Sequence, residues 1–195
     1  MMRFADGFVF QTKDAKEYYK KIARGRGIVI PNPILADNLE SYSICSQTDG
    51  NIVAIGRLTE QKNHKLLIRA FYRISSKYPA CNMYIYGEGP LRKELEQYIR
   101  SLHLENRVYL PGNQKNIYDK MSTASVFVMS SDYEGMPNAL IEAMALGLIC
   151  ISTDCPIGGP RELITNGKNG FLVETGNELE IANMIDFVLS NLDKM

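Results

Sequence analysis

The chain has 195 residues, 45% of them hydrophobic, which is enough to bury about 70% of the unfolded surface around one substantial core. Its 22 basic and 22 acidic residues balance, which excludes a global field that would favour nucleic acid or an acidic membrane surface. No apolar stretch is long enough for a transmembrane segment or a signal peptide. The cysteines form no CxxC pair, so Cys45, Cys81, Cys150 and Cys155 are expected to be buried thiols of a reduced cytoplasmic protein.

The first elements form a strand, helix, strand sequence. Residues 7–11 are predicted to be a strand, 12–23 a helix with Thr12 as its N-cap, and 27–30 a second strand. Two prolines follow, and residues 35–50 lack strong periodicity, so we expect a linker there.

From residue 51 onward, short apolar runs alternate with amphipathic segments. Strands are predicted at 51–55, 82–86, 107–110, 125–129, 148–152 and 171–173. Helices are predicted between and after them at 63–77, 90–102, 114–123, 137–146, 160–165 and 178–191. Strands separated by helices imply a parallel sheet covered on both faces, so we predict a doubly wound, Rossmann-like α/β fold for residues 51–195. Ligands bind such sheets at the carboxyl ends of the strands.

The most informative motif follows the strand at 125–129. Glu134 and Glu142 have seven residues between them, which places one in a loop and the other one turn inside the next helix. Pro137 is expected at the first helical position, and Gly135 permits a ligand to approach the backbone closely. The free N–H groups and the helix dipole suit a phosphate. The two glutamates would then accept hydrogen bonds from hydroxyls on either side of that phosphate.

Two cations follow the strand at 51–55, after the turn at Gly56. Arg57 can form a fork to phosphate oxygens, and Lys62 offers a mobile point charge. Each charge-assisted hydrogen bond to a diphosphate would contribute about 1.5 to 3 kcal/mol. Taken alone, the same two residues are equally well explained as solvated cations on a polar loop.

Glycines mark the ends of two further strands. Gly87 and Gly89 are best explained as a tight connection, and the segment lacks the third glycine of a dinucleotide fingerprint. Gly112, Asn113 and Gln114 either edge a nucleotide base or form an ordinary turn. Gly147 fits the residue that follows a helix C-cap.

Five segments in this order resemble the carboxyl-terminal half of retaining GT-B glycosyltransferases of family four, also called glycosyl transferases group 1. They are GRLTEQK from Gly56, GEGP from Gly87, EGMPNALIEAMALG from Glu134, GGPRE from Gly158 and NGKNGFLV from Asn166. Each segment is ordinary alone, but the ordered set is specific. Residues 5–34 are similar to the last strand and helix of that family's first domain and to the crossing into the second.

The resemblance implies a site for a nucleoside diphosphate sugar, with UDP-sugars the most common donors. Arg57 and Lys62 would hold the diphosphate, Glu142 the ribose and Glu134 the sugar hydroxyls, while the amides of residues 135–138 would lie near the sugar and the distal phosphate. Arg57, Lys62 and Glu134 are the implied catalytic residues. The implied substrate-binding set is Gly56, Arg57, Lys62, Gly112, Glu134, Gly135, Met136, Pro137, Asn138 and Glu142. Neither a metal nor another cofactor is implied, and His64 and His103 are expected to be surface or capping residues.

The family pattern also implies what surrounds this half. Residues 1–34 would be a remnant of the acceptor domain, so the chain is expected to be a fragment, a separately made domain or part of a split enzyme. It would be inactive alone. The acceptor would be a glycan or a lipid-linked sugar in polysaccharide or glycoconjugate biosynthesis, in the cytoplasm or at the inner face of the membrane. The strand at 7–11 would be poorly ordered, repacked or in contact with a partner.

Two other functions stay open. A nucleotide-sugar binding module would hold the donor and transfer nothing, and a sugar-nucleotide epimerase would need its own acid and base across a cleft. An oxidoreductase is disfavoured by the weak match of GEGP to a dinucleotide site.

Overall fold

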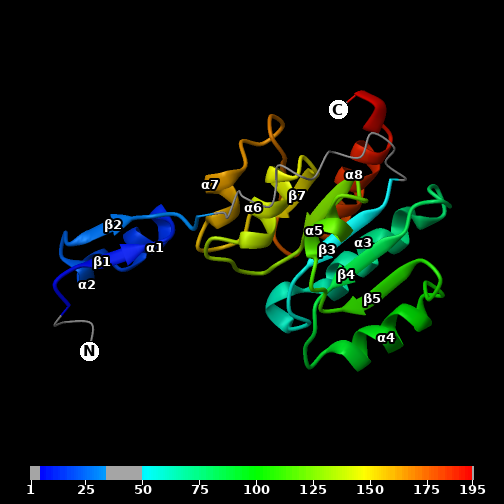
Figure 1. The fold of residues 1–195 in the computed structure, drawn as a ribbon, viewed down its shortest axis with the longest axis horizontal. Helices are drawn as coiled ribbons and strands as arrows, with labels where there is room; N and C mark the ends of the chain where they lie inside the picture. The colour runs from blue at the N-terminus through cyan, green and yellow to red at the C-terminus, as the bar shows by residue number, and fades with distance from the viewer. Residues whose placement is uncertain (1–4, 34–49, 195) are drawn as a thin grey trace.

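A parallel sheet organises most of the chain (Figure 1). The computed structural model describes residues 5–33 and 50–194. Within these ranges the main sheet has six strands in the order β5-β4-β3-β6-β7-β8. In chain order the strands are β3 (Ile52–Ile55), β4 (Met83–Tyr86), β5 (Val108–Gly112), β6 (Val126–Met129), β7 (Ile149–Thr153) and β8 (Phe171–Val173). The order runs outward from β3 on one side and from β6 on the other, which is the doubly wound arrangement. The predicted fold class is confirmed.

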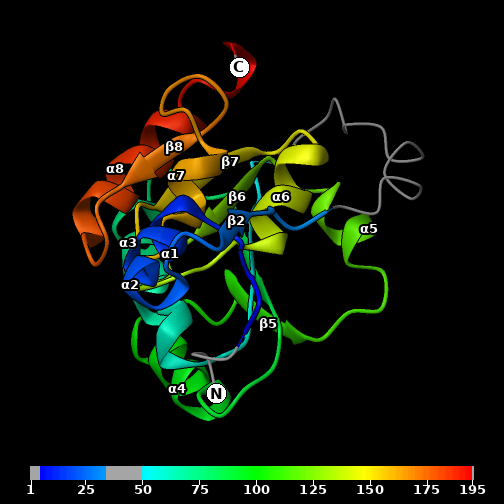
Figure 2. The same ribbon diagram turned by 90° about the vertical axis from the view of Figure 1, so that its left-hand side faces the viewer.

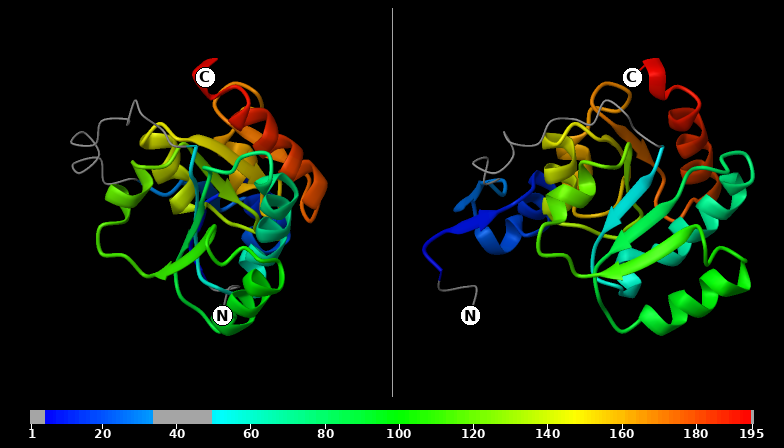
Figure 3. Two further views of the ribbon diagram at one scale, coloured as in Figure 1. Left: turned by 90° about the vertical axis from the view of Figure 1, so that its right-hand side faces the viewer. Right: turned by 45° about the vertical axis from the view of Figure 1, so that its right-hand side comes forward.

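Helices cover both faces of this sheet (Figure 3). One layer comprises α3 (His64–Ser75), α4 (Arg92–Ser101) and α8 (Glu178–Leu189). The opposite layer comprises α5 (Ile117–Met121), α6 (Asn138–Ala145) and α7 (Gly159–Leu163). Strand β6 lies between the two cores, and all four of its residues are buried, as its continuous apolar sequence predicts. Single turns of 3₁₀-helix, η3 (Glu60–Lys62) and η4 (Leu192–Lys194), complete the elements.

Residues 5–33 form a separate small unit, which lies beside α7 in Figures 1 and 2. Strand β1 (Phe8–Phe10) pairs in parallel with β2 (Gly27–Val29), and α1 (Lys13–Tyr18) and α2 (Lys20–Ala23) connect them. Thr12 accepts a hydrogen bond of 3.0 Å from the amide of Ala15 and is the predicted N-cap. The first strand forms outside the main core and pairs with β2, while repacking and contact with a partner both stay predictions for it.

Some predicted boundaries differ from the structure. The helix expected at 12–23 is divided at Tyr19, and the one expected at 114–123 is reduced to α5. Pro137 is the N-cap of α6 with extended backbone angles, so the prediction that it is the first helical residue is wrong. The predicted linker at 35–50 lies, apart from Gly50, outside the described residues, as does Cys45.

The other three cysteines are free and buried, as predicted. Burial raises the pKa of the Cys150 thiol to about 12 and those of Cys81 and Cys155 to about 11, which keeps all three protonated at neutral pH. Across the described parts of the chain, no helix is long and apolar enough to cross a membrane.

Candidate functional site

The central strands β3 and β6 mark the point where the sheet changes its winding direction. They are neighbours in the sheet, but β3 leads to α3 on one face and β6 leads to α6 on the other. The loops after them, residues 56–63 and 130–137, therefore meet at the carboxyl edge, where doubly wound sheets bind ligands. The two predicted motifs are brought together by this topology.

Lys62 and Glu134 form an ion pair between the two loops. The Glu134 carboxylate is largely buried and also accepts a hydrogen bond of 2.7 Å from Ser131 Oγ. The Lys62 stem lies along the turn, because a Cβ added at Gly56 would be 3.1 Å from Lys62 Cδ. Gly56 thus leaves room for the lysine to reach the glutamate.

The two loops are tied together by backbone and side-chain hydrogen bonds. Ser130 Oγ donates to the carbonyls of Lys62 and Asn63 at 2.9 and 3.1 Å. Asn63 adopts a left-handed backbone conformation, and its side-chain amide donates to Asp132 at 2.8 Å. The loop of residues 56–63, here called the cation loop, is therefore held in place by the loop of residues 130–137, the glutamate loop. Arg57, by contrast, is exposed and has no ion pair within the described ranges.

The start of α6 presents free amides to the same edge. The N–H groups of Gly135, Met136 and Asn138 have no acceptor among the residues that the structure describes. Pro137 has no N–H, so it cannot be one of the backbone donors predicted at residues 135–138. The Gly135 carbonyl faces α7, because a Cβ added at Gly159 would lie 1.6 Å from its oxygen. The turns before α6 and α7 are thus interlocked.

Glu142 contacts α5 through its carboxylate. Tyr118 Oη donates to its carboxylate at 3.3 Å. Partial burial raises the pKa of Glu142 above its ordinary value, and the bond from Tyr118 opposes that rise. The two glutamates of the motif therefore occupy different environments, one charge-paired and one beside a phenol.

A pocket of about 360 Å³ opens beside the cation loop. Its lining residues come from the ends of β3, β4 and β5 and from α5, and they are Ile55, Gly56, Arg57, Tyr86, Gly87, Glu88, Asn113, Gln114 and Ile117. The set contains both apolar and polar side chains. Gly112 is buried at the end of β5 next to Glu88, and direct ligand contact by Gly112 stays a prediction.

Residues 5–33 reach the site, which sequence reasoning missed. Asn32 Nδ2 donates to Asn138 Oδ1 at 2.7 Å and to the Met136 carbonyl at 3.3 Å. Gln11 Nε2 donates to Asn32 Oδ1 at 2.6 Å. No spacing in the sequence signals a contact between side chains more than 100 residues apart.

The expectation for His64 is wrong, because the ring is only 5% exposed. It begins α3 and faces inward rather than capping the helix. His103 is exposed, as predicted. Over the described residues, no three His, Cys, Asp or Glu side chains gather closely enough to hold a metal ion.

Comparison with known proteins places these features in a family. Residues 45–195 match the family described as glycosyl transferases group 1. The chain belongs to this family. An uncharacterized glycosyltransferase of Methanocaldococcus jannaschii is 36% identical to the group 1 chain over 197 residues, which covers 95% of the chain and 46% of that relative.

Two further relatives of the group 1 chain carry more specific names. The N-acetylgalactosamine-N,N'-diacetylbacillosaminyl-diphospho-undecaprenol 4-alpha-N-acetylgalactosaminyltransferase of Campylobacter jejuni is 40% identical over 130 residues, covering 67% of the chain and 34% of the relative. The crystal structure of a mutant TarM of S. aureus, in complex with fondaparinux, alpha-GlcNAc-glycerol and UDP, has a TM-score of 0.85 at 26% identity. It covers 95% of the chain and 37% of TarM, so the chain spans less than half the length of these three relatives.

Proposed function

We propose that the chain is the donor-binding part of a retaining GT-B glycosyltransferase of family four that uses a UDP-sugar. The observation that carries this proposal is the convergence of Lys62, Glu134 and the amino end of α6 beside a base-sized pocket. The UDP in the TarM complex supports uracil as the base.

Each part of the donor has a matching group. The base enters the pocket between Tyr86 and Ile117, and the ribose hydroxyls donate to Glu142. Arg57, Lys62 and the free amides before α6 bind the diphosphate. Glu134 accepts from the sugar hydroxyls, and its bond from Ser131 fixes its orientation.

The reaction breaks the bond between the anomeric carbon and the diphosphate oxygen. Positive charge develops on the sugar ring and negative charge on the leaving diphosphate, so stabilising the diphosphate lowers the barrier. Arg57, Lys62 and the helix dipole supply that stabilisation without a metal or another cofactor in this proposal. Lys62 bridges Glu134 and the diphosphate, and so couples sugar binding to leaving-group stabilisation.

Glu134 positions the sugar and does not attack it. Its carboxylate is engaged by Lys62 and Ser131, which reduces its nucleophilicity. A slow donor analogue with a good leaving group should therefore leave no glycosyl adduct on Glu134 by mass spectrometry. Trapping such an adduct would contradict this role.

The acceptor is proposed to be a glycan or a lipid-linked sugar in polysaccharide or glycoconjugate biosynthesis. The name of the Campylobacter relative, with its diphospho-undecaprenol acceptor, supports the lipid-linked option. We place the reaction in the cytoplasm, peripheral to the inner face of the membrane. Residues 1–34 are proposed to belong to the acceptor-binding part.

A thermal-shift panel of UDP-, GDP- and ADP-sugars tests donor binding. A ligand at about 100 times its dissociation constant adds about 2.7 kcal/mol, which should raise the midpoint by about 5 to 10 °C at this size. We expect this shift with UDP-sugars. No shift with any member of the panel would contradict the proposal.

Product analysis distinguishes the alternatives. A binding module, favoured by the chain's coverage of only 46% of its M. jannaschii relative, leaves the donor intact. An epimerase changes the sugar of the free donor without an acceptor. A transferase consumes the donor only when an acceptor and its binding domain are present.

A further inference from the structure

His64 is a buried polar residue that the proposed donor contacts leave unused. It is the first residue of α3 and lies two positions after Lys62. Its ring is 5% exposed, and neither ring nitrogen has a hydrogen-bond partner among the described residues. Most buried polar side chains in native proteins are paired, so an unpaired imidazole directly under a ligand loop requires a specific explanation.

The groups around the ring belong to the cation loop. The backbone carbonyls of Arg57 and Gly56 lie near the ring, and the charge of the Lys62 ammonium group also acts on it. Burial is the largest effect on the pKa of His64, the carbonyls oppose it, and Lys62 adds to it, with a resulting pKa of about 4. At neutral pH the ring is therefore uncharged, with one N–H donor and one acceptor nitrogen.

Residues 56–58, next to the ring, are hydrogen-bonded to the end of β4 and to the loop after it. The Gly56 amide donates at 3.0 Å to the carbonyl of Tyr86 at the end of β4, and the Leu58 amide donates at 3.0 Å to that of Glu88 in the following loop. The Arg57 carbonyl accepts from Thr59 at 2.9 Å, while the Gly56 carbonyl accepts no hydrogen bond within the described residues. A hydrogen-bond donor at the ring would satisfy the Gly56 carbonyl and fix the orientation of the Arg57 side chain.

We propose that His64 is a positioning residue of the diphosphate loop, whose neutral imidazole donates its N–H to the carbonyl of Gly56 or Arg57 when the diphosphate is bound. The bond forms as Lys62 and Arg57 close on the phosphates, and it orients the Arg57 guanidinium and amide toward them. This inference rests on the proposed function, because it assigns His64 to the same diphosphate site.

Binding of UDP and of uridine to the full chain, measured by calorimetry, tests the role. His64→Leu removes the N–H donor and should weaken UDP binding at least about tenfold, the loss expected for one hydrogen bond supporting a charged contact. Uridine binding should stay within about threefold, since uridine carries no phosphate. The midpoint of thermal unfolding should be equal or higher, because leucine leaves no unpaired polar atoms. A purely structural residue would instead lower stability and the affinities for both ligands together.

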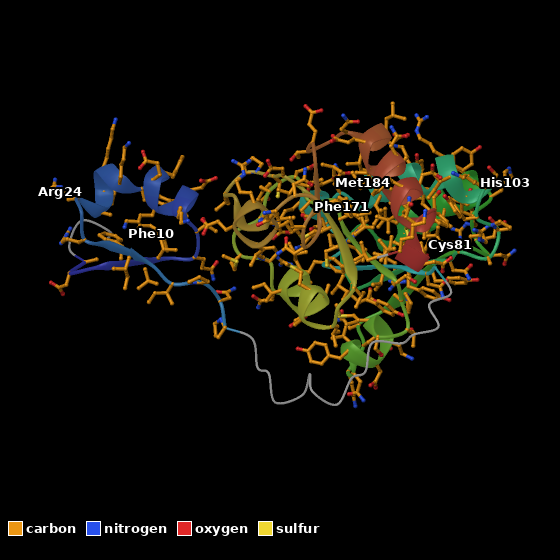
Figure 4. All side chains as sticks on the ribbon, turned by 90° about the horizontal axis from the view of Figure 1, so that it is seen from above. Phe10, Arg24, Cys81, His103, Phe171 and Met184 are labelled. Atoms are coloured by element: carbon orange, nitrogen blue, oxygen red, sulfur yellow. The ribbon has the colours of Figure 1, made fainter. Side chains whose placement is uncertain are left out.

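Conservative variants identify the donating nitrogen. The amide nitrogen of His64→Asn replaces Nδ1, and that of His64→Gln replaces Nε2, so one of the two should restore UDP affinity and the other should not. His103→Asn is the matched control. His103 is the other histidine of the chain, is exposed, and lies at the end of the domain away from the N-terminal unit (Figure 4).

The inference is overturned if His64→Leu binds UDP as tightly as the parent chain, or if neither amide variant restores binding. Should the leucine variant fail to fold, equal UDP affinity of the two amide variants would overturn it. Failure of the parent chain to bind UDP contradicts the proposed function instead. The same variants measured with inorganic pyrophosphate then test His64 alone, and absence of pyrophosphate binding by the parent chain rejects both proposals.

Discussion

Replacing Lys62 should affect the stability of the fold, whereas replacing Arg57 should not. Lys62 neutralises the largely buried Glu134, whereas Arg57 is exposed and makes no ion pair within the described part of the chain. Lys62→Ala should weaken UDP binding and also lower the free energy of unfolding by about 2 kcal/mol, since it leaves a buried carboxylate unpaired. Arg57→Ala should weaken UDP binding with no change in stability. Calorimetry and urea denaturation measure the two effects, and equal loss of UDP and uridine affinity would show that the cations do not bind the diphosphate.

Stability should fall with acid because of His64. Its pKa is about 4 in the folded chain and 6.5 as the ordinary value, so the unfolded chain binds the extra proton between these two pH values. The free energy of unfolding therefore has its full value above pH 6.5. It falls by about 3 kcal/mol in total as the pH is lowered to about 4. Urea unfolding at several pH values should show this slope in the parent chain and in His103→Asn. A His64→Leu variant with an unchanged slope would contradict the assignment.

At the scale of elements, the turns before α6 and α7 should not tolerate a methyl group. A Cβ at Gly159 would meet the Gly135 carbonyl oxygen at 1.6 Å, so one turn must move. Gly159→Ala should therefore cost about 2 to 3 kcal/mol of stability and lower UDP affinity, because the free amides before α6 move with that turn. Gly7→Ala, where the added Cβ would have an ordinary contact of 3.7 Å, is the control for thermal melts and calorimetry. Equal effects of the two substitutions would contradict the proposed interlock.

Sequence patterns predict which elements exist better than where they end. All strands of the main sheet form, because apolar runs such as that of β6 must be buried on both faces. The split of the first helix at Tyr19 and the shortening of α5 come from local backbone choices that periodicity does not encode. Extended angles at Pro137 likewise moved the start of α6 by one residue.

The closeness of the two loops was predictable from the sheet topology, while the ligand contacts of their residues stay predictions. Lys62 and Glu134 could be named because their strands had to end at the same edge, and the structure joins them. Tyr118 and Asn32 could not, since their partners depend on how a short helix and the first unit pack against the domain. His64 was misassigned because its position at a helix start suggested exposure, and only tertiary packing buries it.

At the scale of the whole molecule, the small N-terminal sheet is incomplete. Val9 and Ile28 are paired neighbours on one face, and they are 62% and 55% exposed. Parallel sheets are normally covered on both faces, so contact with a partner stays a prediction for this surface. Val9→Thr and Ile28→Thr should leave thermal stability and UDP affinity unchanged in the isolated chain, since neither side chain packs in the core. A large fall in the melting midpoint would show that the face is already covered.

The isolated chain should bind donor without consuming it. It spans less than half the length of the three relatives described above, and only its residues 1–34 are proposed to belong to the acceptor-binding part. Incubation with a UDP-sugar and lipid-linked or free glycan acceptors should leave the donor intact by liquid chromatography. Formation of a glycosylated acceptor would contradict the need for a separate acceptor domain.

The contact between Gly135 and Gly159 also sets a rule for engineering. Because a Cβ at Gly159 would meet both the Gly135 carbonyl and the Pro137 ring, we expect that neither turn can be exchanged without its counterpart. A graft intended to change sugar preference should carry residues 134–138 and 158–159 as one cassette. The contact between the two glycines thus sets the smallest set of residues that should be exchanged together.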